Sequence, residues 1–277
     1  MSARIRIGLV GTSWYSEFLH LAKIKEHLGA DLCAICGRNR IRADELADKY
    51  SIAQVYTDYQ EMIQRANLQA LVVAAPDDLH YPITMAALEA GLHVLCEKPM
   101  ALNVTHAKAM LEKAQAVGVK HMLCFTNRWS PAYRYLKQLL DQGYLGRCYQ
   151  INIRCVGDYG SGEYNWRVDR ERSNGILGDL GSHMIDLARW YVGDIAQVNG
   201  YLSVFVNRTG LDGKAIDPAN DAAIMNLRFT NGAQGVIQLS AVAQVGELGI
   251  HQQVVLYGEE ATLEIESNLM GGAEMRK

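Results

Sequence analysis

The chain has 277 residues, of which 49% are hydrophobic and 21% charged, and its formal net charge is −3. This composition is typical of a folded protein, and the length suits two domains better than one. Both signs of charge are scattered along the chain, and no basic block indicates a nucleic-acid partner. No apolar run approaches the roughly 20 residues that cross a bilayer, and the N-terminus has no signal-peptide cleavage site. We therefore expect a cytoplasmic protein without a membrane partner.

The six cysteines also favour a reducing compartment, because most of them lie in apolar, strand-like runs. Cys33 and Cys36 form a CxxC pair, a spacing found in metal and redox sites. The sequence has no second such pair, and a strand would point the two side chains to opposite faces. We interpret both as core-filling residues and expect no metal site.

The first half of the chain alternates strand patterns with helix patterns. Strands are expected at residues 4–10, 30–36, 69–76, 92–96 and 120–125, and helices at residues 17–28, 41–50, 81–90 and 105–117. In the first helix, the spacing of Phe18, Leu21 and Leu28 predicts that they face the core. This alternation predicts an α/β fold with a Rossmann-type, doubly wound parallel sheet. Such sheets bind ligands beyond the carboxyl ends of their strands.

The first strand-to-helix turn departs from the dinucleotide-binding fingerprint G-x-G-x-x-G. Gly11 is present, but Ser13 and Ser16 stand where the second and third glycines would be. The position after the first strand still favours a phosphate-binding turn. An ordinary tight turn is the alternative.

The second predicted strand ends in "CGRNR", where an NAD-preferring site commonly has an acidic residue. The guanidinium of Arg38 suits a 2′-phosphate instead, and no nearby carboxylate would repel it. We therefore predict that NADP is favoured over NAD. The alternative is a solvated arginine at the start of a helix.

A later strand ends at Glu97-Lys98-Pro99, although ordinary turns use glycine, asparagine, aspartate and serine. Because the carboxyl ends of parallel strands border the ligand crevice, we expect these two charges to face a ligand.

The pattern changes to a period of two in the second half, after a helix within residues 129–146. Strands are expected at residues 150–156, 223–230, 233–241, 252–258 and 261–267. Their alternation predicts a C-terminal α+β domain with a large, open, mostly antiparallel sheet that has one polar face. We place the domains at residues 1–126 and 127–277, and expect the second to bind substrate and to self-associate.

One helix, within residues 175–193, interrupts these strands. Asp179, His183 and Asp186 are spaced to project from one face of it. A carboxylate one turn before an imidazole can orient it and stabilise the imidazolium, as a general acid/base requires. An exposed ion pair, a metal pair and a helix-dipole role for Asp179 are alternatives. The glycines of this stretch suggest close approach by a ligand or by backbone.

As a whole, the chain resembles the glucose-fructose oxidoreductase/inositol dehydrogenase/rhizopine catabolism family, written Gfo/Idh/MocA. The resemblance runs from residue 4 to about residue 266. It is strongest in "AAPDDLHYPITMAALEAGLHVLCEKPMA", "FTNRWSPAYRYLKQLLDQGYLG" and "GILGDLGSHMIDLARW". It implies an NAD(P)-dependent oxidoreductase that acts on a sugar, inositol or similar polyol, or its keto form.

The resemblance also implies roles for individual residues. The catalytic candidates are Lys98, Asp179 and His183, with Lys98 as electrostatic help and His183 as the group that moves the proton. The candidate cofactor contacts are Gly11, Thr12, Ser13, Trp14, Tyr15, Arg38, Ala75, Pro76, Asp77, His80, Glu97 and Lys98. The candidate substrate contacts are Arg128, Asn165, Trp166 and Arg167.

Three features depart from the family pattern. Ser13 replaces the usual second glycine, and Asn174-Gly175-Ile176 replaces a more glycine-rich segment. Family members usually continue well past residue 267, so we expect a shortened second domain in which the residues after Ser267 are poorly anchored. We expect a homodimer or homotetramer. A cofactor-binding regulator without turnover is the main alternative function, and an enzyme that reduces an imine or a dihydrodiol is another.

Overall fold

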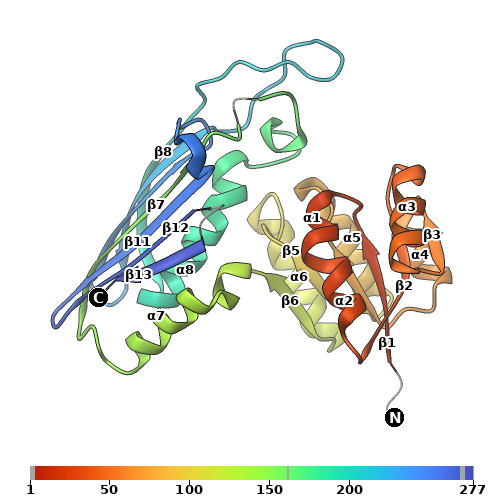
Figure 1. Ribbon diagram of the computed structural model, residues 1–277, viewed down its shortest axis with the longest axis horizontal. Helices are drawn as coiled ribbons and strands as arrows, with labels where there is room; N and C mark the ends of the chain where they lie inside the picture. Colours follow the sequence, from red (N-terminus) through yellow and green to blue (C-terminus); the bar gives the residue numbers. More distant parts are fainter. Residues whose placement is uncertain (1–3, 161, 269–271, 277) are drawn as a thin grey trace. The chain divides into compact units, whose positions relative to one another are not determined.

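The computed structural model describes residues 4–160, 162–268 and 272–276. The chain divides into two compact units, Met1–Cys124 and Phe125–Lys277 (Figure 1). Within the described residues, every helix is too short or too polar to cross a membrane.

The first unit contains a six-stranded sheet in which all neighbouring strands run parallel, in the order β3-β2-β1-β4-β5-β6. The strands are β1 (Ile5–Val10), β2 (Ala30–Cys36), β3 (Gln54–Tyr56), β4 (Ala70–Val73), β5 (His93–Glu97) and β6 (His121–Cys124). The helices are α1 (Trp14–Ser16), the π-helical turn η1 (Glu17–Leu21), α2 (Ala22–Glu26), α3 (Arg40–Tyr50), α4 (Tyr59–Arg65), α5 (Asp77–Glu89) and α6 (Val104–Val117). The predicted doubly wound parallel sheet is confirmed, although β3 and α4 were not predicted.

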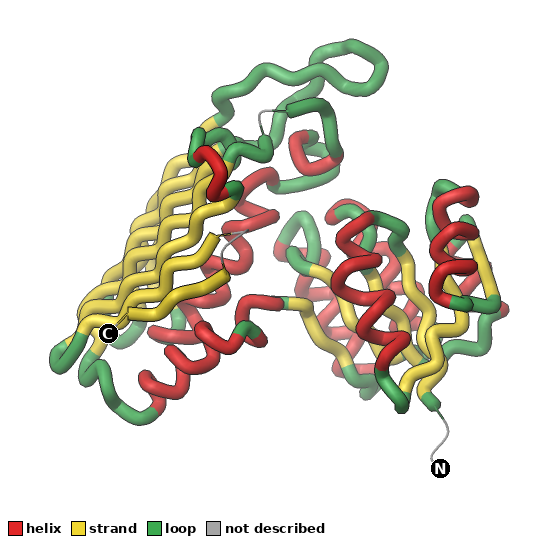
Figure 2. The backbone as a smooth tube through the Cα atoms, in the orientation of Figure 1, coloured by secondary structure: helices red, strands yellow, loops and turns green. Residues whose placement is uncertain are grey.

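Helices cover both faces of this sheet (Figure 2). Val10 points into an apolar cluster to which α4 contributes Met62, together with residues of α5 and α6. Leu9, its neighbour in β1, points to the other face and packs with Leu21 of η1 and Leu46 of α3. This alternation buries β1 on both sides, as a central parallel strand requires.

The first helical segment differs from the regular helix predicted for residues 17–28. It begins with α1 at Trp14 and continues into the π-helical turn η1, whose wider i→i+5 bonding rotates the residues that follow, and α2 ends at Glu26. Leu21 is fully buried as predicted, but Phe18 is 70% exposed and Leu28 is 88% exposed. His20 takes a buried position instead.

The second unit contains a seven-stranded sheet in the order β13-β12-β11-β7-β10-β9-β8. Its strands are β7 (Cys148–Gly157), β8 (Ile195–Ser203), β9 (Ala222–Phe229), β10 (Gln234–Ser240), β11 (Ile250–Gly258), β12 (Thr262–Asn268) and β13 (Gly272–Arg276). Its helices are η2 (Thr126–Trp129), α7 (Pro131–Asp141), η3 (Trp166–Val168), the π-helical turn η4 (Leu177–Gly181), α8 (Ser182–Val192) and η5 (Gly246–Leu248). Neighbouring strands are antiparallel except β7 and β10, which are parallel. The predicted mostly antiparallel sheet is therefore confirmed.

Helices α7 and α8 pack on one face of this sheet (Figure 2). Leu136 of α7 and Leu187 of α8 are fully buried against strand residues such as Ile151 and Ile237. In β7, buried residues alternate with more accessible ones, so that its polar side chains lie on the opposite face. The apolar face of the sheet thus forms the core of the second unit.

The end of the chain is better anchored than expected. Strand β13 pairs antiparallel with β12, from Asn268 opposite Gly272 to Glu264 opposite Arg276. The expectation of poor anchoring after Ser267 is therefore wrong for residues 272–276, while residues 269–271 and 277 lie outside the described residues.

Candidate active site

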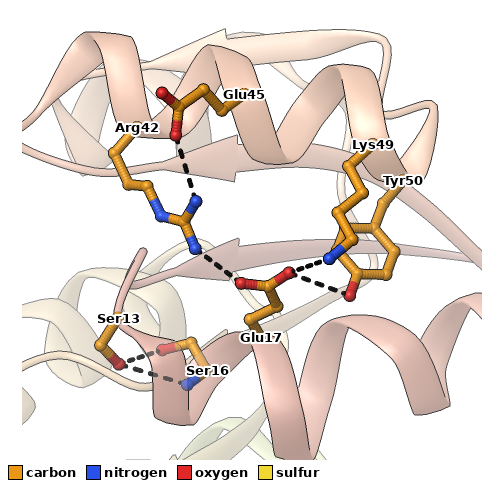
Figure 3. Close-up of polar contacts among 7 residues, drawn as sticks. All are labelled: Ser13, Ser16, Glu17, Arg42, Glu45, Lys49 and Tyr50. Atoms are coloured by element: carbon orange, nitrogen blue, oxygen red, sulfur yellow. Dashed lines mark hydrogen bonds and ion pairs between the residues drawn. The ribbon is translucent and has the colours of Figure 1, made fainter.

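The turn after β1 is built so that serines replace two of the expected glycines. Gly11 has a φ of +130°, and a Cβ there would lie 2.2 Å from the carbonyl oxygen of Ala74, so this position requires glycine. Ser13 caps α1 by accepting a hydrogen bond from the Ser16 N–H at 3.2 Å, and the two hydroxyl oxygens lie 3.0 Å apart. The Ser16 hydroxyl is buried and donates to Ala74 O at 3.3 Å. The Ser16 hydroxyl therefore ties the turn to the residue that follows β4. Figure 3 shows the contacts between Ser13 and Ser16.

Two aromatic residues follow this turn. Trp14 is 72% exposed, whereas Tyr15 is half-buried. Their rings are perpendicular, with centroids 5.8 Å apart. Thr12 lies against the loop after β2, because a Cβ at Gly37 would come within 2.3 Å of its Cγ2.

The loop after β2 carries Arg38, which is exposed and has no ion-pair partner among residues 4–160, 162–268 and 272–276. The arginines that follow are paired. Arg40 lies 2.9 Å from Asp44, and Arg42 donates to Glu17 at 2.6 Å. Arg38 therefore differs from its neighbours in having its charge available to a ligand.

Glu17 is the acceptor of a network between η1 and α3 (Figure 3). Its two carboxylate oxygens accept from Arg42 and from Lys49, each at 2.6 Å, and Tyr50 donates at 3.3 Å. The hydrogen bond from Lys49 lowers the pKa of Glu17 despite some desolvation. The network attaches the helical segment after the Gly11 turn to α3.

The end of β5 is fixed by a buried pair that the sequence did not indicate. His20 Nε2 lies 2.8 Å from Glu97 Oε1, and both side chains are less than a tenth exposed. The other oxygen of Glu97 accepts the backbone N–H of Lys98 at 3.3 Å. Burial alone would raise the pKa of Glu97, but the His20 hydrogen bond and the charge of Lys98 lower it. Glu97 therefore serves as an anchor directly before Lys98.

Cys124 completes a group that could hold a metal ion, since one ligand atom from each of His20, Glu97 and Cys124 lies within 4.8 Å of the others. The 2.8 Å separation of His20 and Glu97 is a hydrogen-bond distance. Burial also raises the pKa of the Cys124 thiol to about 12, which keeps it protonated. We therefore interpret the group as a hydrogen-bonded pair beside a thiol.

His80 joins the loop after β4 to the loop after β5. Its Nε2 lies 2.9 Å from the carbonyl oxygen of Ala75, and its Nδ1 lies 2.6 Å from that of Pro99. Burial lowers the pKa of His80 and outweighs the two carbonyl acceptors, which favour the protonated ring. Asp77, at the start of α5, is also buried. These predicted cofactor residues thus lie together at the carboxyl ends of β4 and β5.

Asp179 and His183 belong to the second unit, whereas Lys98 belongs to the first. The regular helix predicted for residues 175–193 is in fact the π-helical turn η4, which carries Asp179, followed by α8, which carries His183 in its first turn. His183 is 7% exposed, and its ring meets that of Phe125 edge to face with centroids 5.9 Å apart. The His183 ring is therefore buried and packed against an aromatic ring.

The predicted substrate loop contacts Asp179 directly. Arg167 Nε lies 3.4 Å from Asp179 Oδ2, and the Arg167 guanidinium lies over the Trp166 ring at 4.3 Å from its centroid. Asn165 caps the short η3 turn by accepting the Arg167 backbone N–H at 3.0 Å. The loop thus presents a cation to the candidate catalytic carboxylate.

Arg128, also a predicted substrate contact, forms a two-pronged ion pair with Asp186. Nε and Nη2 donate to the two carboxylate oxygens at 2.7 and 2.6 Å. Its guanidinium also lies 5.3 Å from the centroid of the Trp190 ring. The pair holds η2 against α8. Arg128 therefore contributes to the structure of the second unit.

Two glycines near η4 lie close to neighbouring parts of the chain. A Cβ at Gly175, where φ is +58°, would lie 2.3 Å from the carbonyl oxygen of Asn220. A Cβ at Gly181 would lie 2.7 Å from a methyl carbon of Leu239. Of the two explanations offered by the sequence, approach by backbone accounts for Gly175, whereas the near neighbour of Gly181 is a side chain.

Several polar residues near these sites were missed. For His20 the sequence did offer a signal, because a histidine inside the apolar run "FLHL" is expected to be buried. Tyr159 and Arg208, which line a cavity with Asp179, gave no signal, because their neighbourhood is created by segments far apart in the sequence.

Two family models match the chain. The model described as "Oxidoreductase family, NAD-binding Rossmann fold" matches residues 5–125. The model described as "GFO/IDH/MocA C-terminal domain" matches residues 133–264. Together they cover most of both units.

Individual proteins resemble the chain over nearly its whole length. It is 30% identical over 274 residues to "Uncharacterized oxidoreductase sll0816" of Synechocystis sp., a match that covers 96% of this chain and 73% of the relative. It is 29% identical over 260 residues to myo-inositol 2-dehydrogenase of Thermotoga maritima, a match that covers 94% of this chain and 74% of that protein. The crystal structure of the WlbA dehydrogenase of Bordetella pertussis with NADH and UDP-GlcNAcA is similar at a TM-score of 0.87 and 26% identity, covering 96% and 75%. Two further dehydrogenases are matched over 55% of their own length.

Proposed function

Because the chain belongs to the Gfo/Idh/MocA family of NAD-binding oxidoreductases, we propose that it transfers a hydride between a nicotinamide cofactor and a sugar, inositol or related polyol or keto-sugar. The similarity to a myo-inositol 2-dehydrogenase supports this substrate class. The observation that carries the proposal is the carboxyl end of β5, where the buried Glu97 anchors the chain directly before Lys98.

The residues of the first unit fit a dinucleotide. Gly11 stands at the first glycine of the fingerprint, which the tight turn requires, because a Cβ there would meet the carbonyl oxygen of Ala74. The exposed Arg38 supplies a cation where the second strand ends. We propose that the phosphates bind at Gly11, Thr12, Ser13, Trp14 and Tyr15, and that Ala75, Pro76, Asp77, His80 and Glu97 lie along the rest of the cofactor.

The chemistry divides between two side chains. When bound, the nicotinamide accepts or supplies the hydride. Lys98 stabilises the negative charge that develops on the substrate oxygen. His183 accepts the hydroxyl proton during oxidation and returns it during reduction.

The neighbours of His183 support this role. Asp179 stabilises the imidazolium, and Arg167, 3.4 Å away, restrains the Asp179 carboxylate. Asn165, Trp166 and Arg167 border the substrate. Arg128, which is held by Asp186, borders it from η2.

We further infer that NADP binds at least as well as NAD. The cationic Arg38 has no carboxylate partner in the described part of the chain and suits a 2′-phosphate better than a ribose hydroxyl.

We also propose that the protein self-associates in a reducing cytoplasm as a homodimer or homotetramer. Tyr201 and Ile224, paired across β8 and β9, are 73% and 47% exposed on the sheet face that α7 and α8 leave uncovered. All six cysteines are free thiols, which supports the compartment. Light scattering of the purified chain gives the number of subunits, and a monomer at all concentrations would contradict the proposal.

A panel of sugars and inositols, assayed with each nicotinamide cofactor by the absorbance of the reduced form, tests the function. At least one polyol should support steady turnover. Tight cofactor binding without turnover of any polyol or keto-sugar would overturn the proposal.

A further inference from the structure

The second unit contains a small cavity that is lined in part by the candidate site residues Asn165, Arg167 and Asp179. It has a volume of about 20 Å³. Its polar walls are Tyr159, Asn165, Arg167, Asp179, Arg208, Asn220 and Asp221. A cavity of about 10–15 Å³ is enough for one water molecule, so this one has room for a single oxygen atom.

Arg208 offers an unused hydrogen-bond donor to this cavity. Its side chain is 4% exposed and forms an ion pair with Asp221, whose side chain is 3% exposed, at 2.5 Å. Its Nη2 also donates to the carbonyl oxygen of Gly160, and its Nη1 donates to that of Val206 at 3.3 Å. Only Nε, which is buried, has no hydrogen-bond partner among the described residues. A buried donor on a charged group is costly to leave unpaired.

Tyr159, which follows β7, offers a second unused group. Its hydroxyl is buried and likewise finds no partner within the described ranges. Burial and the negative charge of Asp179 raise the pKa of Tyr159 well above its ordinary value. The hydroxyl therefore stays protonated and can both donate and accept a hydrogen bond.

We propose that the cavity binds one neutral oxygen that accepts the Arg208 Nε–H and shares a hydrogen bond with the Tyr159 hydroxyl. The charged walls are two cations and two carboxylates, Arg167, Arg208, Asp179 and Asp221. Because these charges balance, a neutral ligand is favoured over an ion.

The oxygen has two sources with the same chemistry. It is a water molecule in the free protein, or it is a hydroxyl of the bound polyol, in which case the inference rests on the proposed function. In both cases Tyr159 and Arg208 bind it in the cavity that Asp179 also lines.

Replacing Tyr159 by phenylalanine distinguishes the sources. Tyr191→Phe is the matched control, because the buried Tyr191 hydroxyl donates to the carbonyl oxygen of Tyr133 at 3.0 Å. If water fills the cavity, Tyr159→Phe lowers the Tm of the free full-length chain by about 2–4 °C, as Tyr191→Phe should. If a polyol hydroxyl fills it, Tyr159→Phe does not lower the free-protein Tm but raises the KM for the polyol about tenfold, roughly the value of one hydrogen bond. The control should leave KM unchanged.

The site is overturned if Tyr159→Phe leaves the Tm unchanged or raises it and also leaves KM unchanged, since removing a hydroxyl that has no partner relieves a burial cost. If no polyol is turned over, the proposed function fails. The Tm of Tyr159→Phe, compared with that of the wild type without substrate, then decides whether the cavity binds an oxygen. A Tm that Tyr159→Phe does not lower then overturns the site.

Discussion

His20 Nε2 lies 2.8 Å from Glu97 Oε1, in a pair whose members are 77 residues apart in the sequence. His20 lies on the π-helical turn η1, which follows the turn after β1, and Glu97 ends β5 directly before Lys98. The pair therefore links the segment proposed to bind the pyrophosphate to the segment that carries the proposed electrostatic catalyst.

Breaking this pair should destabilise the protein. His20→Leu leaves the buried Glu97 carboxylate without its partner, so we expect a loss of about 3 kcal/mol in the free energy of unfolding. Denaturant unfolding of the whole chain measures this loss. The control is His121→Leu on the exposed start of β6, which should change stability by less than about 0.5 kcal/mol. Equal losses for the two variants would contradict a special role for the pair.

The stability of the protein should depend on pH through the ionisation of Glu97. Its pKa in the folded protein is lowered below the ordinary value of 4.5, so its stabilising effect is complete above about pH 4.5 and is lost as the pH falls through the lowered pKa. Glu97→Gln should therefore be less stable than the wild type at pH 7, and the difference should shrink below about pH 4. Unfolding curves from pH 3 to pH 7 test this. A difference that is constant over this range would show that the Glu97 charge contributes nothing.

Loss of the proposed proton acceptor should affect turnover more than binding. His183→Ala should reduce kcat by about 100- to 10,000-fold, the usual value of general acid/base help, with nearly unchanged cofactor affinity. Asp179→Asn should cost less, because the imidazole remains. The exposed His27 provides a control, and His27→Ala should retain full activity. Near-normal kcat in His183→Ala would leave Lys98, or a tyrosine such as Tyr164, as the candidate for proton transfer.

Arg38 should decide the choice of cofactor. Arg38→Ala should weaken NADP binding by about 10- to 100-fold, the range expected for charged hydrogen bonds, and leave NAD binding nearly unchanged. Arg40→Ala is the matched control, since Arg40 is engaged with Asp44. Fluorescence titration with both cofactors measures the affinities. A clear preference for NAD that Arg38→Ala does not alter would refute the assignment.

The elements with strong periodicity could be predicted, and those without it could not. The buried β4 and the alternating β7 were found, because tertiary burial matches their sequence patterns. Strand β8 was missed because most of its residues are exposed, so it has no apolar alternation. Strand β3 has only three residues, too few for a period to be visible. The expected placement of Phe18 was wrong because the hydrogen bonding of the π-helical turn η1 breaks the regular helical spacing.

Candidate site residues could be chosen from the sequence where a local motif carries them, as for Gly11 and Lys98. Their partners were not, because they come from distant segments. Asp186 was placed beside Asp179 and His183 on one helix face, but its ion-pair partner is Arg128, which was expected to contact substrate. Ser16 was taken as a loss from the glycine fingerprint, yet its hydroxyl forms a hydrogen bond to the end of β4.

The parallel pairing of β7 with β10 has a consequence for how this architecture can diversify. Parallel neighbours cannot be joined by a hairpin, so the chain must travel back before β10 can begin. The segment between them, residues 158–233, contains η3, η4 and α8, and therefore both Arg167 and His183, before β8 and β9 rejoin the sheet. The two bounding strands are held by main-chain hydrogen bonds, which do not depend on the side chains between them. Asn165, Trp166 and Arg167, three of the residues proposed to meet the substrate, thus lie in a connection outside the sheet, where a substitution need not disturb the strand pairing.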